Sequence, residues 1–178
     1  MILMKNTKKI TLSAMMAACA TAFMLLSYFP YLTYAIPAIS GLFIMVTVIE
    51  IDKKWALFSY FTSAVLVFLM AEPESMLMYV CFFGYYPIIK ALIEKLNKAI
   101  PEWILKMIVF YFAVFLAYYV FAGVLGINLE DINQLGKYSV LILLGMGSVV
   151  FVLYDIAVSK ISYMYLARFH ARNSRIFK

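Results

Sequence analysis

Charged residues, cysteines and histidines are all scarce in this 178-residue sequence. Only 13% of its residues are charged and 66% are hydrophobic, whereas soluble domains carry roughly 25% charged residues. The chain therefore has too little polar surface to cover a soluble globule. Its two cysteines, Cys19 and Cys81, both lie within apolar runs, where cysteine behaves as a small buried hydrophobe. We therefore expect neither a disulfide framework nor a metal site.

Catalytic motifs are also missing. The one histidine, His170, lies in a basic C-terminal stretch, and the sequence contains no HExxH, GxSxG or P-loop motif. Hydrolysis thus has no recognisable nucleophile, base or metal-ligand set. We predict that the protein is not an enzyme and needs no cofactor. If it drives active transport, another chain must hydrolyse the nucleotide.

Long apolar segments fill most of the chain. Because a helix needs about 20 apolar residues to cross a bilayer, we predict an all-α integral membrane protein that forms one six-transmembrane-helix bundle over residues 1–178. We expect a multi-pass protein of the plasma membrane, surrounded by lipid. The predicted spans cover residues 10–29, 34–49, 55–71, 76–89, 104–125 and 138–158.

Two prolines and a run of lysines refine the middle of this arrangement. Pro73 suits the first turn of the fourth span, and Pro87 should kink that span near its inner end. Residues 88–99 place apolar side chains at helical spacing, with lysines on the other face. This pattern predicts an amphipathic helix that lies along the inner membrane surface.

Basic residues gather on one side of the predicted bundle. Fourteen of the fifteen Lys and Arg residues follow alternate crossings, and the loops on the other side contain only Lys137. The positive-inside rule then places both the N- and the C-terminus in the cytoplasm. The net charge of +6 is explained by contact with the anionic inner leaflet, so we expect no nucleic acid partner.

The first span carries a stripe of small residues. Ala14, Ala18 and Ala22 recur at every fourth position, and on a helix this spacing forms a smooth strip that another helix can approach closely. The stripe predicts either a docking surface for a separate subunit or close packing within the bundle.

The segment that contains this stripe resembles a known family. Residues 8–18, KKITLSAMMAA, followed by six spans with both termini inside, are similar to the substrate-binding S components of energy-coupling factor (ECF) vitamin transporters. This resemblance implies that Ala14, Ala18 and Ala22 contact a coupling transmembrane subunit, which sits on two cytoplasmic ATPase subunits. It also implies a vitamin-like small molecule bound near the outer face.

Aromatic residues are frequent toward the outer ends of the predicted spans. Tyr31, Tyr34, Tyr79 and Tyr118 lie there, with Asn133 among the polar loop residues. Turned inward, these side chains would bind a flat ligand and orient it through their hydroxyl and amide groups. Turned outward, the tyrosines would form the aromatic belt of an ordinary membrane protein.

One ionisable residue, Asp155, lies well inside a predicted span. A carboxylate at such depth is costly and often functional, so we expect it to pair with Lys160 or with a residue on another helix. The alternative is an interfacial position, because Lys160 is only about one turn away.

Two other functions remain open. A structural scaffold resembling the rod-shape-determining MreD proteins would have a similar size and number of spans, and it would bind protein partners but no solute. An intramembrane enzyme would depend on Asp155 alone. The outer aromatic residues favour a solute-binding subunit, whereas the lack of a clear polar ligand set favours a scaffold.

Overall fold

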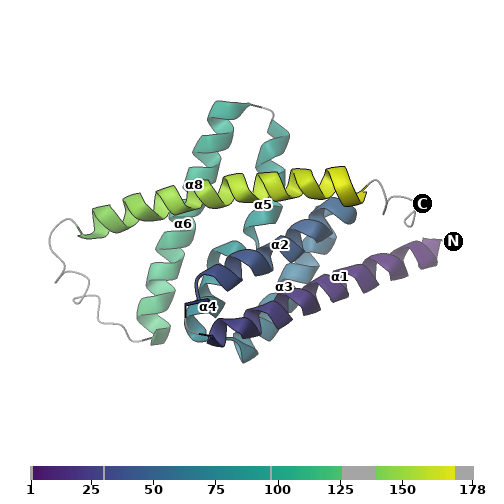
Figure 1. Cartoon of the computed structure of the whole chain (residues 1–178), viewed down its shortest axis with the longest axis horizontal. Coiled ribbons are helices and arrows are strands. Elements are labelled where there is room, and N and C mark those ends of the chain that lie inside the picture. The colour runs from purple at the N-terminus through teal and green to yellow at the C-terminus, as the bar shows by residue number, and fades with distance from the viewer. Residues whose placement is uncertain (1, 30, 97, 126–138, 171–178) are drawn as a thin grey trace.

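The computed structural model describes residues 2–29, 31–96, 98–125 and 139–170, and helices make up nearly all of this part of the chain (Figure 1). The all-helical fold predicted from the sequence is confirmed for these residues. Short 3-10 turns at Leu25–Tyr28 and Glu94–Leu96 and π-helical turns at Tyr79–Phe83 and Leu166–His170 join or extend the main helices. The main helices are α1 (Ile2–Met24), α2 (Ala35–Glu50), α3 (Lys53–Met70), α4 (Pro73–Met78), α5 (Tyr86–Ile93), α6 (Ala99–Leu125) and α8 (Ser139–Tyr165).

Local sequence signals explain several of the helix boundaries. The side chain of Asp52 accepts a hydrogen bond from the backbone N–H of Lys53 at 2.7 Å and so caps α3. Pro73 lies in the first turn of α4, as predicted, because a proline there lacks only an N–H that would have no helical partner. Pro101 lies in the first turn of α6 for the same reason.

The first three helices pack against one another. Ser13, Ala17 and Met24 on α1 are buried, and Ser59 on α3 donates a hydrogen bond to the backbone oxygen of Ser13 at 3.0 Å. The small side chains of Ser13, Ala17 and Ser59 allow the helix backbones to approach closely. The start of α1 and the end of α8 lie at the same end of the molecule (Figure 1).

The predicted fourth span is a broken helix. After α4 comes the π-helical turn Tyr79–Phe83, and α5 begins at Tyr86 with Pro87 in its first turn. The break at Gly84 and Tyr85 precedes Pro87, because a proline ring clashes with the carbonyl four residues before it. Gly84 also lies against Tyr60, and a Cβ at this position would be 2.7 Å from that ring.

The region that the sequence suggested as an inner amphipathic helix is arranged differently. Residues 88–93 belong to α5, Glu94–Leu96 form a 3-10 turn, and α6 already begins at Ala99. Lys90, which the helical pattern placed on a polar outer face, is only 3% exposed. Its burial is explained by counter-charges on neighbouring helices, described below.

In the part of the chain that the structure describes, length and composition allow four helical stretches to cross a membrane: Asn6–Tyr28, Pro73–Leu96, Ala99–Ala117 and Leu144–Arg168. The apolar helix α2 is shorter, at 16 residues, and α3 begins with two lysines. Large apolar side chains such as Phe61 on α3, Phe112 on α6 and Val149 on α8 are exposed. In water such a surface would cause aggregation, and in lipid it is ordinary.

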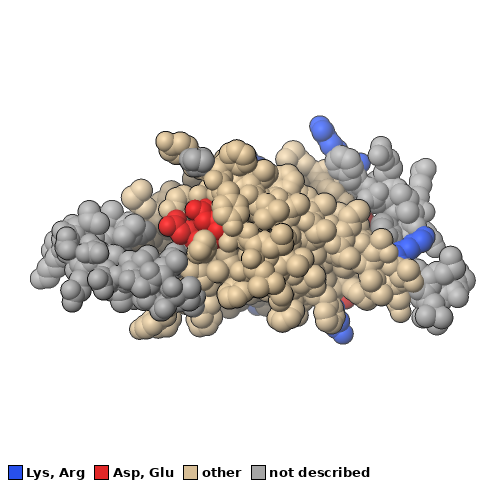
Figure 2. All heavy atoms as spheres, turned by 90° about the horizontal axis from the view of Figure 1, so that it is seen from below, with Lys and Arg blue, Asp and Glu red and all other residues tan. Residues whose placement is uncertain are grey.

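Exposed charged side chains are unevenly distributed along the long axis of the molecule. On the face shown in Figure 2, the largest acidic patch lies toward one end and most Lys and Arg atoms lie toward the other. Glu72 and Glu74 lie at the junction of α3 and α4, whereas Lys53 and Lys54 lie at the junction of α2 and α3. This distribution agrees with the gathering of Lys and Arg residues on one side of the bundle predicted from the sequence.

Candidate functional site

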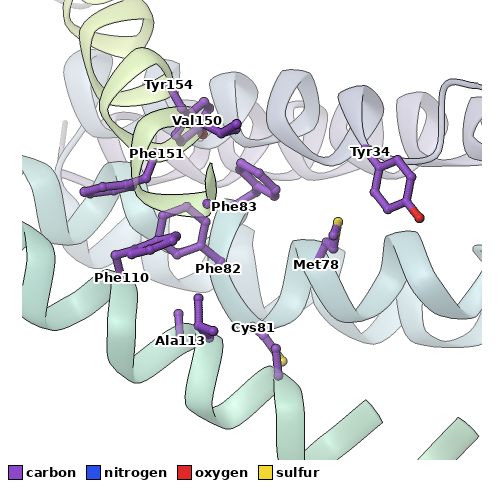
Figure 3. A pocket seen from close by; sticks show the side chains of 13 residues that line it. Tyr34, Met78, Cys81, Phe82, Phe83, Phe110, Ala113, Val150, Phe151 and Tyr154 are labelled. Carbon is purple, nitrogen blue, oxygen red and sulfur yellow. The ribbon is translucent and has the colours of Figure 1, made fainter. Parts of the chain in front are cut away.

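A cavity of about 400 Å³ lies between the start of α2, the π-helical turn, α6 and α8 (Figure 3). Its volume is within the range of small-molecule sites in proteins, roughly 300 to 1,000 Å³. Apolar atoms make up nearly all of its walls. The aromatic side chains that line it are Tyr34, Phe82, Phe83, Phe110, Phe151 and Tyr154.

The π-helical turn places two of these aromatic residues. The N–H of Gly84 donates to the backbone oxygen of Tyr79, five residues earlier, at 2.8 Å. A π-helical turn contains one residue more than an α-helical turn, which changes the directions of the side chains that follow, and such turns are frequent at functional sites. The ring of Phe82 lies 5.9 Å from that of Phe110 and 5.7 Å from that of Phe151, centroid to centroid.

Stacked rings hold α6 and α8 together on the opposite wall. The rings of Phe110 and Phe151 are 4.8 Å apart and nearly parallel, with 17° between their planes. Ala113, Ala117 and Gly147 also line the cavity, and their small side chains leave the space between the helices open. A Cβ at Gly147 would be 3.3 Å from the ring of Phe110.

Two tyrosines belong to the lining. The hydroxyl of Tyr34 donates to Glu74 at 3.4 Å. The hydroxyl of Tyr154 is buried and has no hydrogen-bond partner within the described part of the chain, and it lies 3.1 Å from the position of a Cβ at Gly41. A buried hydroxyl without a partner is unfavourable, and this one lies against α2 at Gly41, which does not line the cavity.

The structure separates the tyrosines that the sequence suggested as ligands. Tyr34 lines the cavity. Tyr31 is 98% exposed, with a positive φ of 73°, and Tyr79 is fully buried in the core, where its hydroxyl lies 2.7 Å from that of Ser63. The side chain of Tyr118 and the whole of Asn133 lie outside the described residues. Ligand binding by these five residues stays a prediction.

A buried cluster of charges lies next to the cavity. Asp155 on α8, Lys90 on α5 and Lys106 on α6 are each at most 3% exposed. Lys106 donates to one carboxylate oxygen of Asp155 at 3.0 Å, and Lys90 forms an ion pair with the other. Lys90 also donates to the backbone oxygen of Asp155 at 3.0 Å. One carboxylate therefore connects three helices.

Two glutamates complete the balance of charge. Glu94 lies 3.1 Å from Lys90 and 3.3 Å from Lys106, and Glu102 lies 2.8 Å from Lys106. Both glutamates are partly exposed, whereas the two ammonium groups are buried. Because three carboxylates surround two ammonium groups, each buried cation has a counter-charge, as burial requires.

Tyr86 connects this cluster to the cavity. Its hydroxyl donates to Asp155 at 2.6 Å, and its ring lies 4.9 Å from that of Phe82 and 5.4 Å from that of Phe151. The same tyrosine therefore contacts two lining residues and the carboxylate that joins α5, α6 and α8. The sequence singled out Asp155 and suggested Lys160 or another helix as its partner; in the structure its partners lie on other helices, and Lys160 is exposed.

The alanine stripe faces outward. Ala14, Ala18 and Ala22 are exposed on α1, whereas Ser13 and Ala17, on the neighbouring strip, are buried. The stripe is thus open to contact from outside the chain. Docking of a coupling subunit on it stays a prediction.

The described residues thus form an apolar cavity beside a buried cluster of charges. Among the described residues, no group of three or more His, Cys, Asp or Glu side chains is placed to hold a metal ion. Comparisons with protein-family models, with curated proteins and with solved structures found no match to this chain. Function must therefore be inferred from the geometry of the site.

Proposed function

We propose that the chain is the substrate-binding membrane subunit of an ECF-type importer, which captures a small vitamin-like molecule for uptake driven by separate ATPase subunits. The observation that carries this proposal is the aromatic cavity of about 400 Å³ between α6, α8 and the π-helical turn. A cavity of this size, walled by rigid rings, is suited to a small molecule.

The lining defines the chemistry of the solute. Rings of Phe82, Phe110 and Phe151 would stack on a flat aromatic group, and the apolar walls offer no counter-charge to a charged one. The hydroxyl of Tyr34 would orient the solute by a hydrogen bond. The solute is therefore an aromatic compound in which at least the part inside the cavity carries no charge.

The remaining parts of the proposal concern topology and partners. The chain spans the plasma membrane six times with both termini in the cytoplasm, in accordance with the distribution of basic residues. The exposed stripe of Ala14, Ala18 and Ala22 is the contact surface for a coupling transmembrane subunit. That subunit in turn binds two ATPase subunits, since this chain has no P-loop.

Two glycines on the same helix allow a matched test. Gly147 lines the cavity, and a Cβ there meets Phe110, whereas a Cβ at Gly145 meets nothing within 4 Å. Gly147→Leu should fill the cavity and weaken binding of the solute at least about tenfold, because the solute and the new side chain compete for one space. Gly145→Leu makes the same change in helix propensity on the same helix, and this variant should bind the solute as tightly as the wild type.

The measurement is equilibrium binding of the solute to each purified variant, with thermal unfolding to show that both are folded. Equal affinity in Gly147→Leu and Gly145→Leu would contradict the assignment of the cavity. A wild-type protein that co-purifies with membrane partners but carries no solute would instead favour the scaffold function.

A further inference from the structure

A second concave surface lies between α3 and α5, away from the aromatic cavity. This groove has a volume of about 460 Å³, and its walls are almost entirely apolar. Leu57, Ile89 and Leu92 are among the side chains that line it, together with Lys53 and Lys54 at the first turn of α3. Leu57 and Leu92 are more than half exposed, so the groove opens toward the surroundings of the helices.

Lysines gather at one end of this groove. The ammonium group of Lys53 donates to the backbone oxygen of Ala91 at 2.5 Å, which fixes it between α3 and α5. Lys53 precedes the predicted third span, and its pKa is lowered by partial burial and then by the nearby charge of Lys95. Repulsion between two ammonium groups is unfavourable unless an anion lies near both.

Carboxylates do not balance this group of lysines. Within the described residues, Lys53, Lys54 and Lys95 form no ion pair with an Asp or Glu side chain. Asp52 lies beside Lys53, and its charge acts to raise the pKa of Lys53 but is the smallest of the influences on it. Its carboxylate also accepts from the backbone N–H at the start of α3. By contrast, Lys90 and Lys106 are both paired. The mouth of the groove thus carries positive charge that Asp52 offsets only in part.

We propose that this groove binds an anionic phospholipid, with an acyl chain along Leu57, Ile89 and Leu92 and the phosphate among Lys53, Lys54 and Lys95. This assignment rests on two features together, the apolar walls of the groove and the lysines at its mouth. Apolar walls on a helix surface suit an acyl chain, and a basic pocket at the cytoplasmic ends of spans suits an anionic headgroup. A soluble anion would gain nothing from the apolar walls, and a neutral lipid would gain nothing from the lysines.

The test uses the full chain, purified in mild detergent and titrated with phosphatidylglycerol or phosphatidylcholine, with bound lipid counted by native mass spectrometry. The wild type should bind phosphatidylglycerol at least about tenfold more tightly than phosphatidylcholine. The triple variant Lys53→Gln/Lys54→Gln/Lys95→Gln should lose this preference. A control variant with the same loss of charge, Lys9→Gln/Lys98→Gln/Lys160→Gln, should keep it.

Two further variants separate the headgroup from the acyl chain. Lys54→Gln leaves the bond from Lys53 to Ala91 in place and should weaken phosphatidylglycerol binding about threefold or more. Ile89→Trp narrows the groove and should weaken phosphatidylglycerol binding without removing a charge. If the two triple variants lose equal affinity, or if millimolar inorganic phosphate displaces the lipid from the wild type, the proposal is wrong.

Discussion

Replacing Asp155 with asparagine should destabilise the protein more than any other single change in the buried charge cluster. The substitution keeps the size of the side chain and removes its charge. Lys90 and Lys106 would then lose the carboxylate that they share, and the hydroxyl of Tyr86 would lose a charged acceptor at 2.6 Å. The three helices α5, α6 and α8 would lose their common ionic contact.

The expected magnitude follows from the partners that remain. Removing one member of a buried ion pair costs about 3 to 5 kcal/mol, because an uncompensated charge is left behind. Here Lys90 keeps Glu94 at 3.1 Å and Lys106 keeps Glu102 at 2.8 Å. We therefore expect the lower end of that range, about 3 kcal/mol. Lys90→Met should cost less, about 2 kcal/mol, because Asp155 keeps Lys106 and Tyr86.

The assay is unfolding in mixed micelles of increasing denaturing detergent, followed by tryptophan fluorescence. The protein has two tryptophans, and the ring of Trp103 lies 5.5 Å from the ammonium group of Lys106, so it reports on the cluster. The double variant Asp155→Asn/Lys90→Met should be more stable than the sum of the single effects predicts, by about 1 to 3 kcal/mol.

A control and a refuting result complete this test. Glu74→Gln changes an exposed carboxylate and should alter stability by at most about 0.5 kcal/mol. The reasoning is refuted if Asp155→Asn is as stable as Glu74→Gln, or if the double variant equals the sum of its single variants.

Two further predictions concern topology and docking. In a variant without native cysteines, Glu74→Cys should react with an impermeant thiol reagent in intact cells and Lys98→Cys should not; labelling of Lys98→Cys from outside would contradict the predicted orientation. Ala18→Trp should hold a partner helix away from α1 and prevent co-purification with coupling and ATPase subunits while leaving solute affinity unchanged. Ala157→Trp, at an exposed alanine on α8, should have neither effect, and intact co-purification of Ala18→Trp would remove the docking hypothesis.

The sequence predicted the helical fold because the signals for it are local. An apolar run of membrane-spanning length is a continuous stretch of sequence, and a proline in the first turn marks the start of a helix within a few residues. The break before Pro87 was also expected from its ring. The sequence did not indicate that the turn before it is π-helical, nor that Gly84 lies against the ring of Tyr60 on α3.

The candidate site depended on contacts that the sequence pattern does not encode. Tyr34 was recognised because it lies at the end of a predicted span. Phe82, Phe110 and Phe151 were not, because phenylalanines in the middle of apolar spans look like ordinary lipid-facing residues. Their convergence depends on the angle at which α8 crosses α6.

The burial of Lys90 was missed for a similar reason. Helical spacing alone places Lys90 on a polar face, and nothing local indicates a counter-charge 65 residues away. Asp155 was singled out correctly as a buried carboxylate in a span, since such groups need partners. Which partners it has depends on how α5, α6 and α8 pack.

The central claim is that the aromatic cavity holds a small molecule, and native mass spectrometry of gently purified protein tests it most directly. The wild type should carry one bound aromatic compound, released on collisional activation, and Gly147→Leu purified in parallel should carry none. Gly145→Leu should retain it. A wild-type protein with an empty cavity in every preparation, or a compound retained equally by Gly147→Leu, would contradict the account.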